Sequence, residues 1–166
     1  MPANGLHDPM AYLMRLPAKR VRPVAVLMVH ELFGGTADGA MEEALGIELF
    51  HNFTLMHDDI MDEAPLRRGK PTVHAKWNTN TAILSGDAML VRAYMQMGRN
   101  ARVMELFNRY ALEVCEGQQL DMDFERRDEV ALVEYKEMIR LKTAVLLSCA
   151  MQVGAVLAGA SENDVE

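Results

Sequence analysis

The chain has 166 residues, half of them hydrophobic, and a formal net charge of −7 at pH 7. This length fits a single domain over residues 1–166 with a sizeable core, and the negative charge argues against nonspecific binding to nucleic acid. Two cysteines are too few for a disulfide framework, so we expect Cys115 and Cys149 to be free, buried thiols in a reducing compartment. The N-terminal residues MPANGLHDPM hold no apolar signal core, and the chain is therefore predicted to be cytoplasmic.

Strand signals are poor, whereas the 14 methionines and the many Leu and Ala residues favour helix, so we predict an all-α chain. In chain order, the expected helices cover residues 11–16, 23–33, 40–62, 80–97, 102–124 and 132–158. Residues 65–80, PLRRGKPTVHAKWNTN, are expected to form a loop. The most apolar stretch, residues 143–160, is borderline short for a membrane span, so we expect a buried helix and no stable membrane span.

The helix expected over residues 40–62 carries a stripe of ionisable side chains. At 100° per residue, His51, Asp58 and Asp62 lie within about 40° of one another, and Thr54 lies near them. Two carboxylates at i and i+4 repel each other, and the C-terminal end of a helix is the unfavourable end for negative charge. A divalent cation would relieve this repulsion, and hard carboxylate oxygens suit Mg²⁺. The pattern therefore predicts a Mg²⁺ site at Asp58 and Asp62.

A basic group follows the acidic one, at Arg67, Arg68 and Lys70. Guanidinium groups hold phosphate oxygens in bidentate fashion, so Arg67 and Arg68 together with the metal would form a diphosphate site. The ordinary interpretation is a solvated helix end followed by a charged loop. Grouped charge of each sign favours a ligand site instead.

Three further clusters are weaker when each is taken alone. Lys19, Arg20 and Arg22 precede the helix expected from Pro23 and fit either a second anion site or an ordinary basic turn. Lys142 lies at the edge of a long apolar run, where it is either a snorkelling side chain or a phosphate ligand. Gln118 and Asp121 share one helix face at i and i+3, which by itself indicates nothing specific.

Taken together, these residues resemble the trans-type polyprenyl synthetases, the isoprenyl diphosphate synthase family. The segments that carry the resemblance occur in the family's order: KRVRP, HNFTLMHDDIMD, LRRGKPT, AILSGDAML, GQQLD and RLKTA. The resemblance implies antiparallel helices around a central cavity, and a homodimer. It also implies Mg²⁺-dependent head-to-tail condensation of isopentenyl diphosphate with an allylic diphosphate, which is dimethylallyl, geranyl or farnesyl diphosphate.

The resemblance also implies roles for single residues. Asp58 and Asp62 correspond to metal ligands, and Asp59 belongs to the same motif with a less direct role. The isopentenyl diphosphate site would comprise Lys19, Arg22, His51 and Arg68. The allylic diphosphate would contact Arg67, Lys142 and Thr143, with Gln118 and Asp121 nearby. Of all these, the residues expected to be catalytic are Asp58, Asp62, Arg67 and Lys142.

The resemblance further implies which residues set product length. In this family the growing chain extends beside the DDxxD helix, and residues four and five positions before the first aspartate set the floor of the cavity. These are Thr54, which is small, and Phe53, which is rotated by about 140° from Asp58. We therefore expect a short product, C15 or C20, with C15 slightly favoured.

The sequence departs from the family pattern in three places. Pro17 and Ala18 stand where the family has two glycines, the first helix is largely absent, and no second aspartate-rich motif precedes the final ASENDVE. We therefore expect the N-terminal part of a longer enzyme or a shortened relative, with little condensation activity of its own. Two alternatives stay open: a non-catalytic diphosphate-binding fragment or partner subunit, and a class I terpene cyclase. KRVRP and LRRG argue against the cyclase, which needs no isopentenyl diphosphate site.

Overall fold

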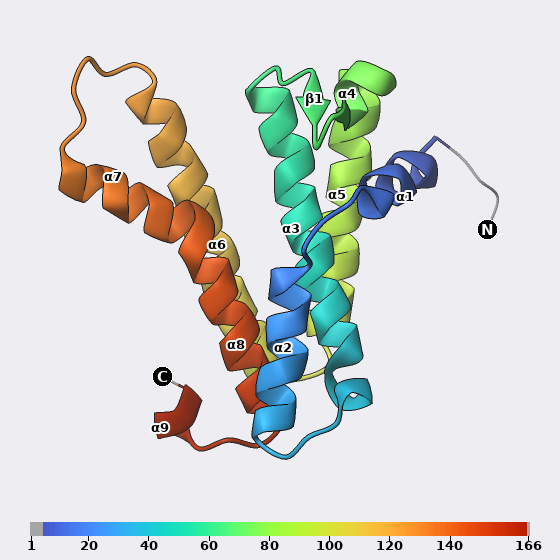
Figure 1. Cartoon of the computed structure of the whole chain (residues 1–166), viewed down its shortest axis with the longest axis vertical. Helices are drawn as coiled ribbons and strands as arrows, with labels where there is room; N and C mark the ends of the chain where they lie inside the picture. Colours follow the sequence, from blue (N-terminus) through green and yellow to red (C-terminus); the bar gives the residue numbers. More distant parts are fainter. Residues whose placement is uncertain (1–4, 166) are drawn as a thin grey trace. The chain divides into compact units, whose positions relative to one another are not determined.

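The structure, a computed structural model, describes residues 5–165 (Figure 1). The described residues form helices and a single two-stranded hairpin, which confirms the predicted all-α class. They divide into two compact units: a first unit of residues 1–20 and 45–96, and a second unit of residues 21–44 and 97–166. Each unit is described by itself below, and the single domain over residues 1–166 stays a prediction.

The first unit contains the predicted DDxxD segment. Its elements are α1 (His7–Arg15), most of α3 (Met41–Met61), β1 (Leu66–Arg67), β2 (Lys70–Pro71), α4 (Val73–Lys76) and nearly all of α5 (Thr79–Met97). Helices α3 and α5 lie side by side, since the His57 ring lies 3.2 Å from the Ile83 carbonyl oxygen (Figure 1). The core of this unit comprises Met10, Leu13, Leu16, Met56, Val73, Ala82 and Met89.

The second unit consists of α2 (Val21–Leu32), η1 (Ala37–Ala40), α6 (Ala101–Phe124), α7 (Leu132–Ile139), η2 (Arg140–Ala144), α8 (Val145–Leu157) and α9 (Glu162–Val165). Asn100 begins α6, because its side-chain oxygen accepts hydrogen bonds from the backbone N–H groups of Arg102 and Val103 at 2.9 and 3.2 Å. Fully buried side chains of the unit include Val26, Val103, Phe107, Cys149 and Val153.

Helices α2 and α8 approach each other closely at Gly154. A Cβ atom at this position would lie 2.4 Å from the Val26 carbonyl oxygen, so no larger residue fits without a backbone shift. The same crossing buries His30, whose Nδ1 lies 3.3 Å from the Gly154 carbonyl oxygen. The small residues of the C-terminal apolar run therefore allow helix packing in this unit.

Three details differ from the sequence predictions. Residues 65–80 are not only loop, because they contain the hairpin and α4. The helix expected over residues 132–158 is interrupted by η2, a π-helical turn with one extra residue. Cys115 is exposed rather than buried, since it lies on the outward face of α6 next to buried Val114, whereas Cys149 is buried and its burial raises its pKa to about 12.

The stretch Leu132–Leu157 is long and apolar enough to cross a membrane, by length and composition only. Half of its most apolar window is buried inside the structure, and core helices of soluble proteins pass the same test. Burial of Val145, Leu146 and Val153 supports the interpretation as a core helix.

Candidate active site

The three aspartates of DDIMD lie where α3 ends. Asp58 and Asp59 are in the last turn of the helix, and the Asp62 N–H donates to the Asp58 carbonyl oxygen at 2.9 Å, one residue past the end of α3. Glu63 then adopts a left-handed conformation with φ 49°, which turns the chain toward the hairpin. The carboxylates differ in exposure: the Asp58 side chain is 19% exposed and that of Asp59 is 3% exposed.

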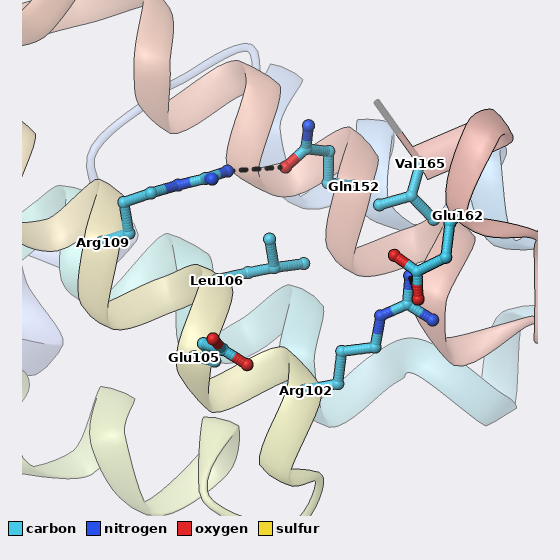
Figure 2. A pocket seen from close by; sticks show the side chains of 7 residues that line it. All are labelled: Arg102, Glu105, Leu106, Arg109, Gln152, Glu162 and Val165. Carbon is cyan, nitrogen blue, oxygen red and sulfur yellow. Dashed lines mark hydrogen bonds and ion pairs between the residues drawn. The ribbon is translucent and has the colours of Figure 1, made fainter.

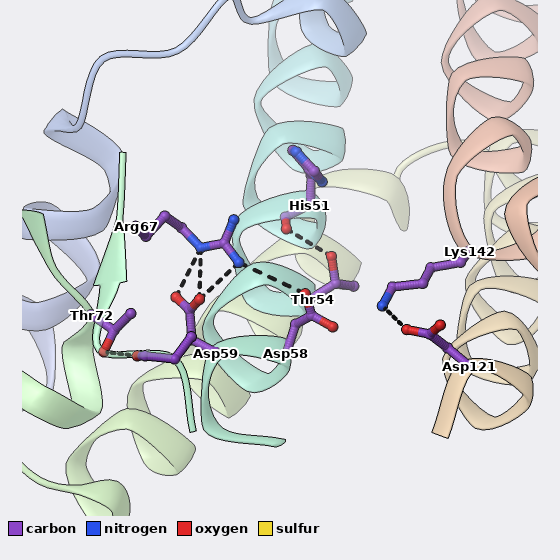
Figure 3. A network of polar contacts seen from close by, with 9 residues as sticks. His51, Thr54, Asp58, Asp59, Arg67, Thr72, Asp121 and Lys142 are labelled. Carbon is purple, nitrogen blue, oxygen red and sulfur yellow. Dashed lines mark hydrogen bonds and ion pairs between the residues drawn. The ribbon is translucent and has the colours of Figure 1, made fainter. Parts of the chain in front are cut away.

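Arg67 joins two of these carboxylates (Figure 3). Its Nε lies 2.9 Å from both Asp59 carboxylate oxygens, and its Nη2 lies 2.8 Å from Asp59 Oδ1. The same Nη2 lies 3.7 Å from Asp58 Oδ2. Asp59 is thus the aspartate that holds Arg67 beside the predicted metal ligand, a role that the sequence interpretation did not assign to it.

The hairpin that carries Arg67 has a two-residue turn. Arg68 has φ 53° and Gly69 has φ 74°, while Arg67 pairs with Lys70 and Leu66 with Pro71. Two consecutive positive φ values are the mark of a type I′ turn, which favours Asn-Gly or Gly-Gly. Arg68 therefore occupies a position that an arginine rarely adopts, and such strain in a structure is a reason to look for function.

A third arginine lies near Arg68. The pKa of the Arg68 guanidinium is lowered below its ordinary value by burial, then by the charges of Arg20 and Arg67, while Glu48 and Asp59 oppose the shift. Arg20 is held in place by an ion pair with Glu48 and by a hydrogen bond of 2.5 Å that it donates to the Met14 carbonyl oxygen. Like charges held this close would gain from a bound anion.

Glu48 and Asn52 form a buried polar pair that sequence reasoning missed. The Asn52 Nδ2 donates to Glu48 Oε1 at 2.7 Å, and Glu48 in turn pairs with Arg20. Both are almost fully buried. The available signal was two polar residues at i and i+4 within the apolar segment GIELFHNF.

The residues predicted to set product length lie one turn earlier on α3. The Thr54 hydroxyl donates to the His51 carbonyl oxygen at 2.8 Å, which fixes it against its own helix. The Phe53 ring is half-buried against the core of the first unit, with its centroid 4.7 Å from the His57 ring and 5.6 Å from the Phe50 ring. His57 also contacts the α5 backbone, and this contact links α3 to α5.

In the second unit, η2 presents two more of the predicted residues. The Lys142 Nζ lies 2.5 Å from Asp121 Oδ2 on α6, and both side chains are partly exposed (Figure 3). The Arg22 Nη2 donates to the Thr143 carbonyl oxygen at 3.3 Å. Predicted residues from α2, α6 and η2 are therefore in contact within this unit.

Gly117 explains how α6 meets η2. A Cβ atom on Gly117 would lie 2.2 Å from the Lys142 backbone nitrogen and 2.6 Å from the Leu141 carbonyl carbon. Only glycine allows this approach, and it brings the backbone of Lys142 directly against the face of α6 that also carries Gln118 and Asp121.

The predicted residues thus form two groups. The first unit holds Asp58, Asp59, Asp62, Arg67, Arg68, His51 and exposed Lys19, and the second holds Arg22, Gln118, Asp121, Lys142 and Thr143. Within residues 5–165, no three His, Cys, Asp or Glu side chains are grouped as a metal site. The roles assigned to these residues stay predictions.

A separate cavity of about 320 Å³ lies in the second unit beside α9 (Figure 2). Two of its cations have partners within the cavity: Arg102 pairs with Glu162 at 2.9 Å, and Arg109 donates to Gln152 at 3.4 Å. None of the residues that line it was predicted to be functional.

Comparison with known proteins places this geometry in context. The polyprenyl synthetase family matches residues 3–166. A geranylgeranyl diphosphate synthase from Methanosarcina mazei is 40% identical over 97% of this chain and 52% of its own length. A geranylfarnesyl diphosphate synthase from Natronomonas pharaonis is 35% identical over 97% of this chain and 54% of its own length.

Solved structures agree with these relatives. A geranylgeranyl pyrophosphate synthase superposes with a TM-score of 0.94 at 54% identity, covering 97% of this chain and 51% of that one. A geranyltranstransferase from Thermotoga maritima superposes with a TM-score of 0.90 at 31% identity, covering 96% of this chain and 62% of that one. The chain spans about half the length of the curated relatives it matches. On the strength of the match over residues 3–166, the chain belongs to the polyprenyl synthetase family.

Proposed function

We propose that this chain is the metal- and allylic-diphosphate-binding part of a trans-prenyltransferase, which condenses isopentenyl diphosphate with an allylic diphosphate. The observation that carries the proposal is the contact of Arg67 with Asp58 and Asp59 at the end of α3. It sets a guanidinium beside the carboxylates of the DDxxD segment, as a diphosphate site requires. The family membership and the printed names of the relatives support the same activity.

The donor set fits Mg²⁺. Asp58 and Asp62 are one helical turn apart, and both offer hard oxygen ligands. Mg²⁺ keeps several waters and completes its coordination with phosphate oxygens, so one or two carboxylates suffice. When bound, the ion would supply Lewis-acid stabilisation of the negative charge on the leaving diphosphate.

The chain's own residues would hold the two diphosphates and orient them. Arg67 and Lys142 are proposed to bind the allylic diphosphate and to stabilise its charge as the C–O bond ionises. Lys19, Arg22, His51 and Arg68 are proposed to hold isopentenyl diphosphate, whose double bond attacks the allylic cation before a proton is lost. The pKa of Arg68 is lowered first by burial and then by the charges of Arg20 and Arg67. A bound diphosphate would relieve the repulsion among these three cations.

The apolar wall beside α3 would exclude water from the cation. Phe53 contributes to that wall from its place against the core of the first unit. We propose a short product of C15 or C20. The C15 preference drawn from Phe53 stays a prediction, and the names of the relatives, geranylgeranyl diphosphate synthases among them, favour C20. The homodimer and the cytoplasmic location also stay predictions.

A non-catalytic diphosphate-binding subunit is the second candidate. The observation that favours it is a relative, 35% identical over 93% of this chain, that is a heptaprenyl diphosphate synthase component 2 from Geobacillus stearothermophilus. The prenyl diphosphate synthases among the relatives argue against a terpene cyclase.

Two measurements on the purified chain test the proposal. Calorimetry with geranyl diphosphate should show binding with Mg²⁺ that is lost with EDTA and in Asp58→Asn. Transfer of radiolabelled isopentenyl diphosphate into a product extracted by organic solvent should be slow but faster than in Asp58→Asn. Binding with no transfer above that variant favours the non-catalytic subunit, and absence of Mg²⁺-dependent binding contradicts both.

A further inference from the structure

The first unit contains a second cavity, of about 740 Å³, away from the DDxxD residues. Its walls come from α1 and from the segment that runs from β2 through α4 (Figure 1). Buried Leu16 and half-buried Tyr12 and Trp77 form an apolar floor, and exposed Arg15, Lys70 and Lys76 stand around it. In the described part of the chain, neither Asp58, Asp59 nor Arg67 lines this cavity.

Aromatic rings hold one of the cations in place. The Lys76 Nζ lies 3.8 Å from the Tyr12 ring centroid and 4.7 Å from that of Trp77. The two rings meet edge to face at 5.3 Å, and the Tyr12 hydroxyl donates to the Pro71 carbonyl oxygen at 2.8 Å. These cation–π contacts restrict a side chain that is otherwise flexible, so an anion that binds Lys76 has less disorder to overcome.

The charge of the cavity opposes the charge of the whole chain. Three cations and one acid, Asp8, line it, although the chain carries a formal net charge of −7. Among residues 5–165, none of the three cations forms an ion pair. The cavity in the second unit differs, because its Arg102 is already paired with Glu162.

We propose that this cavity binds the phosphate group of a ligand, at a site separate from the DDxxD site. The three cations would contact the phosphate oxygens. The apolar floor and the indole of Trp77 suit the glycerol and first acyl carbons of an anionic phospholipid, which carries the same phosphate chemistry as the free ion. The proposal does not depend on the prenyltransferase function.

Trp77 makes the site directly observable, because it is the only tryptophan in the chain. Its fluorescence is titrated with inorganic phosphate, with phosphatidylglycerol vesicles and with phosphatidylcholine vesicles, and with KCl at matched ionic strength. Saturable changes with phosphate and with phosphatidylglycerol indicate a general phosphate site, and a change with phosphatidylglycerol alone identifies the lipid headgroup. No saturable change with either, or equal changes with KCl or with phosphatidylcholine, overturns the proposal.

Variants locate the effect. Arg15→Gln/Lys70→Gln is expected to weaken binding by about tenfold for each cation removed. Arg126→Gln/Lys136→Gln is the matched control, since it removes the same charge at exposed positions outside the cavity. Lys76→Gln provides a second test inside the cavity, with circular dichroism as the check on folding. Equal weakening in the control pair and in the cavity variants would show general electrostatic attraction and overturn the site.

Discussion

Asp58 and Asp59 are neighbours in the sequence, but their carboxylates have different surroundings. Asp59 is buried and receives three short contacts from Arg67, whereas Asp58 is more exposed and lies 3.7 Å from the same guanidinium. Hydrogen bonds between charged groups contribute about 1.5–3 kcal/mol, so Asp59 is the residue that stabilises the end of α3 against the hairpin.

Asparagine at each position should therefore separate stability from metal binding. Asp59→Asn should lower the free energy of unfolding by about 2 kcal/mol, because it leaves Arg67 without its main partner. Asp58→Asn should cost less stability and should abolish Mg²⁺-dependent binding of geranyl diphosphate. Urea denaturation and calorimetry measure the two effects, and equal destabilisation by both variants would contradict the division of roles.

Product length is a second prediction at the residue scale. Phe53 lies against Phe50 and His57, and Thr54 is fixed by its hydrogen bond to the His51 carbonyl oxygen. In an active synthase that contains this chain, Phe53→Ala should lengthen the product by removing an aromatic wall, and Thr54→Phe should shorten it. Chromatography of the extracted products tests this, and an unchanged distribution in both variants would show that the floor lies elsewhere.

At the scale of elements, η2 and α6 are positioned by one glycine. Since a Cβ on Gly117 would lie 2.2 Å from the Lys142 backbone nitrogen, the π-helical turn can lie against α6 only without a side chain there. The same contact sets the Lys142 ammonium 2.5 Å from Asp121. Glycine at position 117 is therefore required both for the packing of η2 against α6 and for the position of the Lys142 ammonium.

Gly117→Ala should disrupt both. Overpacking against backbone atoms costs about 1–3 kcal/mol, so the melting temperature should fall and the Lys142–Asp121 contact should lengthen. Gly5→Ala is the control, because a Cβ at Gly5 has no atom within 4 Å. Thermal unfolding of both variants is the measurement; a Gly117→Ala protein as stable as Gly5→Ala would mean that η2 adjusts freely.

Sequence reasoning found elements whose signals are local. The helix that ends in DDIMD was predicted over residues 40–62 and is observed as Met41–Met61, because Pro65 marks its end. The hairpin was missed because Arg68, at a turn position that favours Asn or Gly, hides the two-residue turn. The π-helical turn was missed because apolar periodicity over residues 132–158 cannot show one extra residue.

The site residues likewise divide into those with a local sequence signal and those without one. Asp58 and Asp62 were grouped by their helical spacing, which is a local property. The contact of Arg67 with Asp59 depends on how the hairpin folds back onto α3, and Arg20 with Glu48 depends on a contact 28 residues apart in the chain. Such contacts carry no periodic signal, so only the structure could assign them.

At the scale of the whole molecule, two helices expose apolar stripes. On α2 the exposed residues are Val21, Val24, Met28 and Leu32, with Leu32 at 78% exposure. On α5 they are Leu84, Val91 and Met95. Each set follows helical spacing, which distinguishes it from scattered surface residues and is typical of a surface that another chain covers.

We therefore expect the isolated chain to self-associate. Met28→Lys/Leu32→Lys should lower the average mass measured by sedimentation equilibrium, because it places two charges on the α2 stripe. Leu132→Lys/Val133→Lys adds the same charge at equally exposed apolar residues of α7 and serves as the control. A monodisperse monomer before substitution would refute the expectation.

The π-helical turn of η2 also determines where this part of the chain can change in length. An α-helix advances by 100° per residue, and η2 holds one residue more than an α-helical turn would. Because the wide turn absorbs this extra residue, deleting one residue within Arg140–Ala144 would restore an α-helical turn and change the rotation of α8 by much less than 100°. Deleting one residue from the regular helix just after η2 would instead rotate the rest of α8 by about 100°. Cys149 and Val153 would then leave the core, and Gly154 would no longer face Val26. The core packing of α8 should therefore tolerate the loss of one residue from η2 and not from the regular turns that follow it.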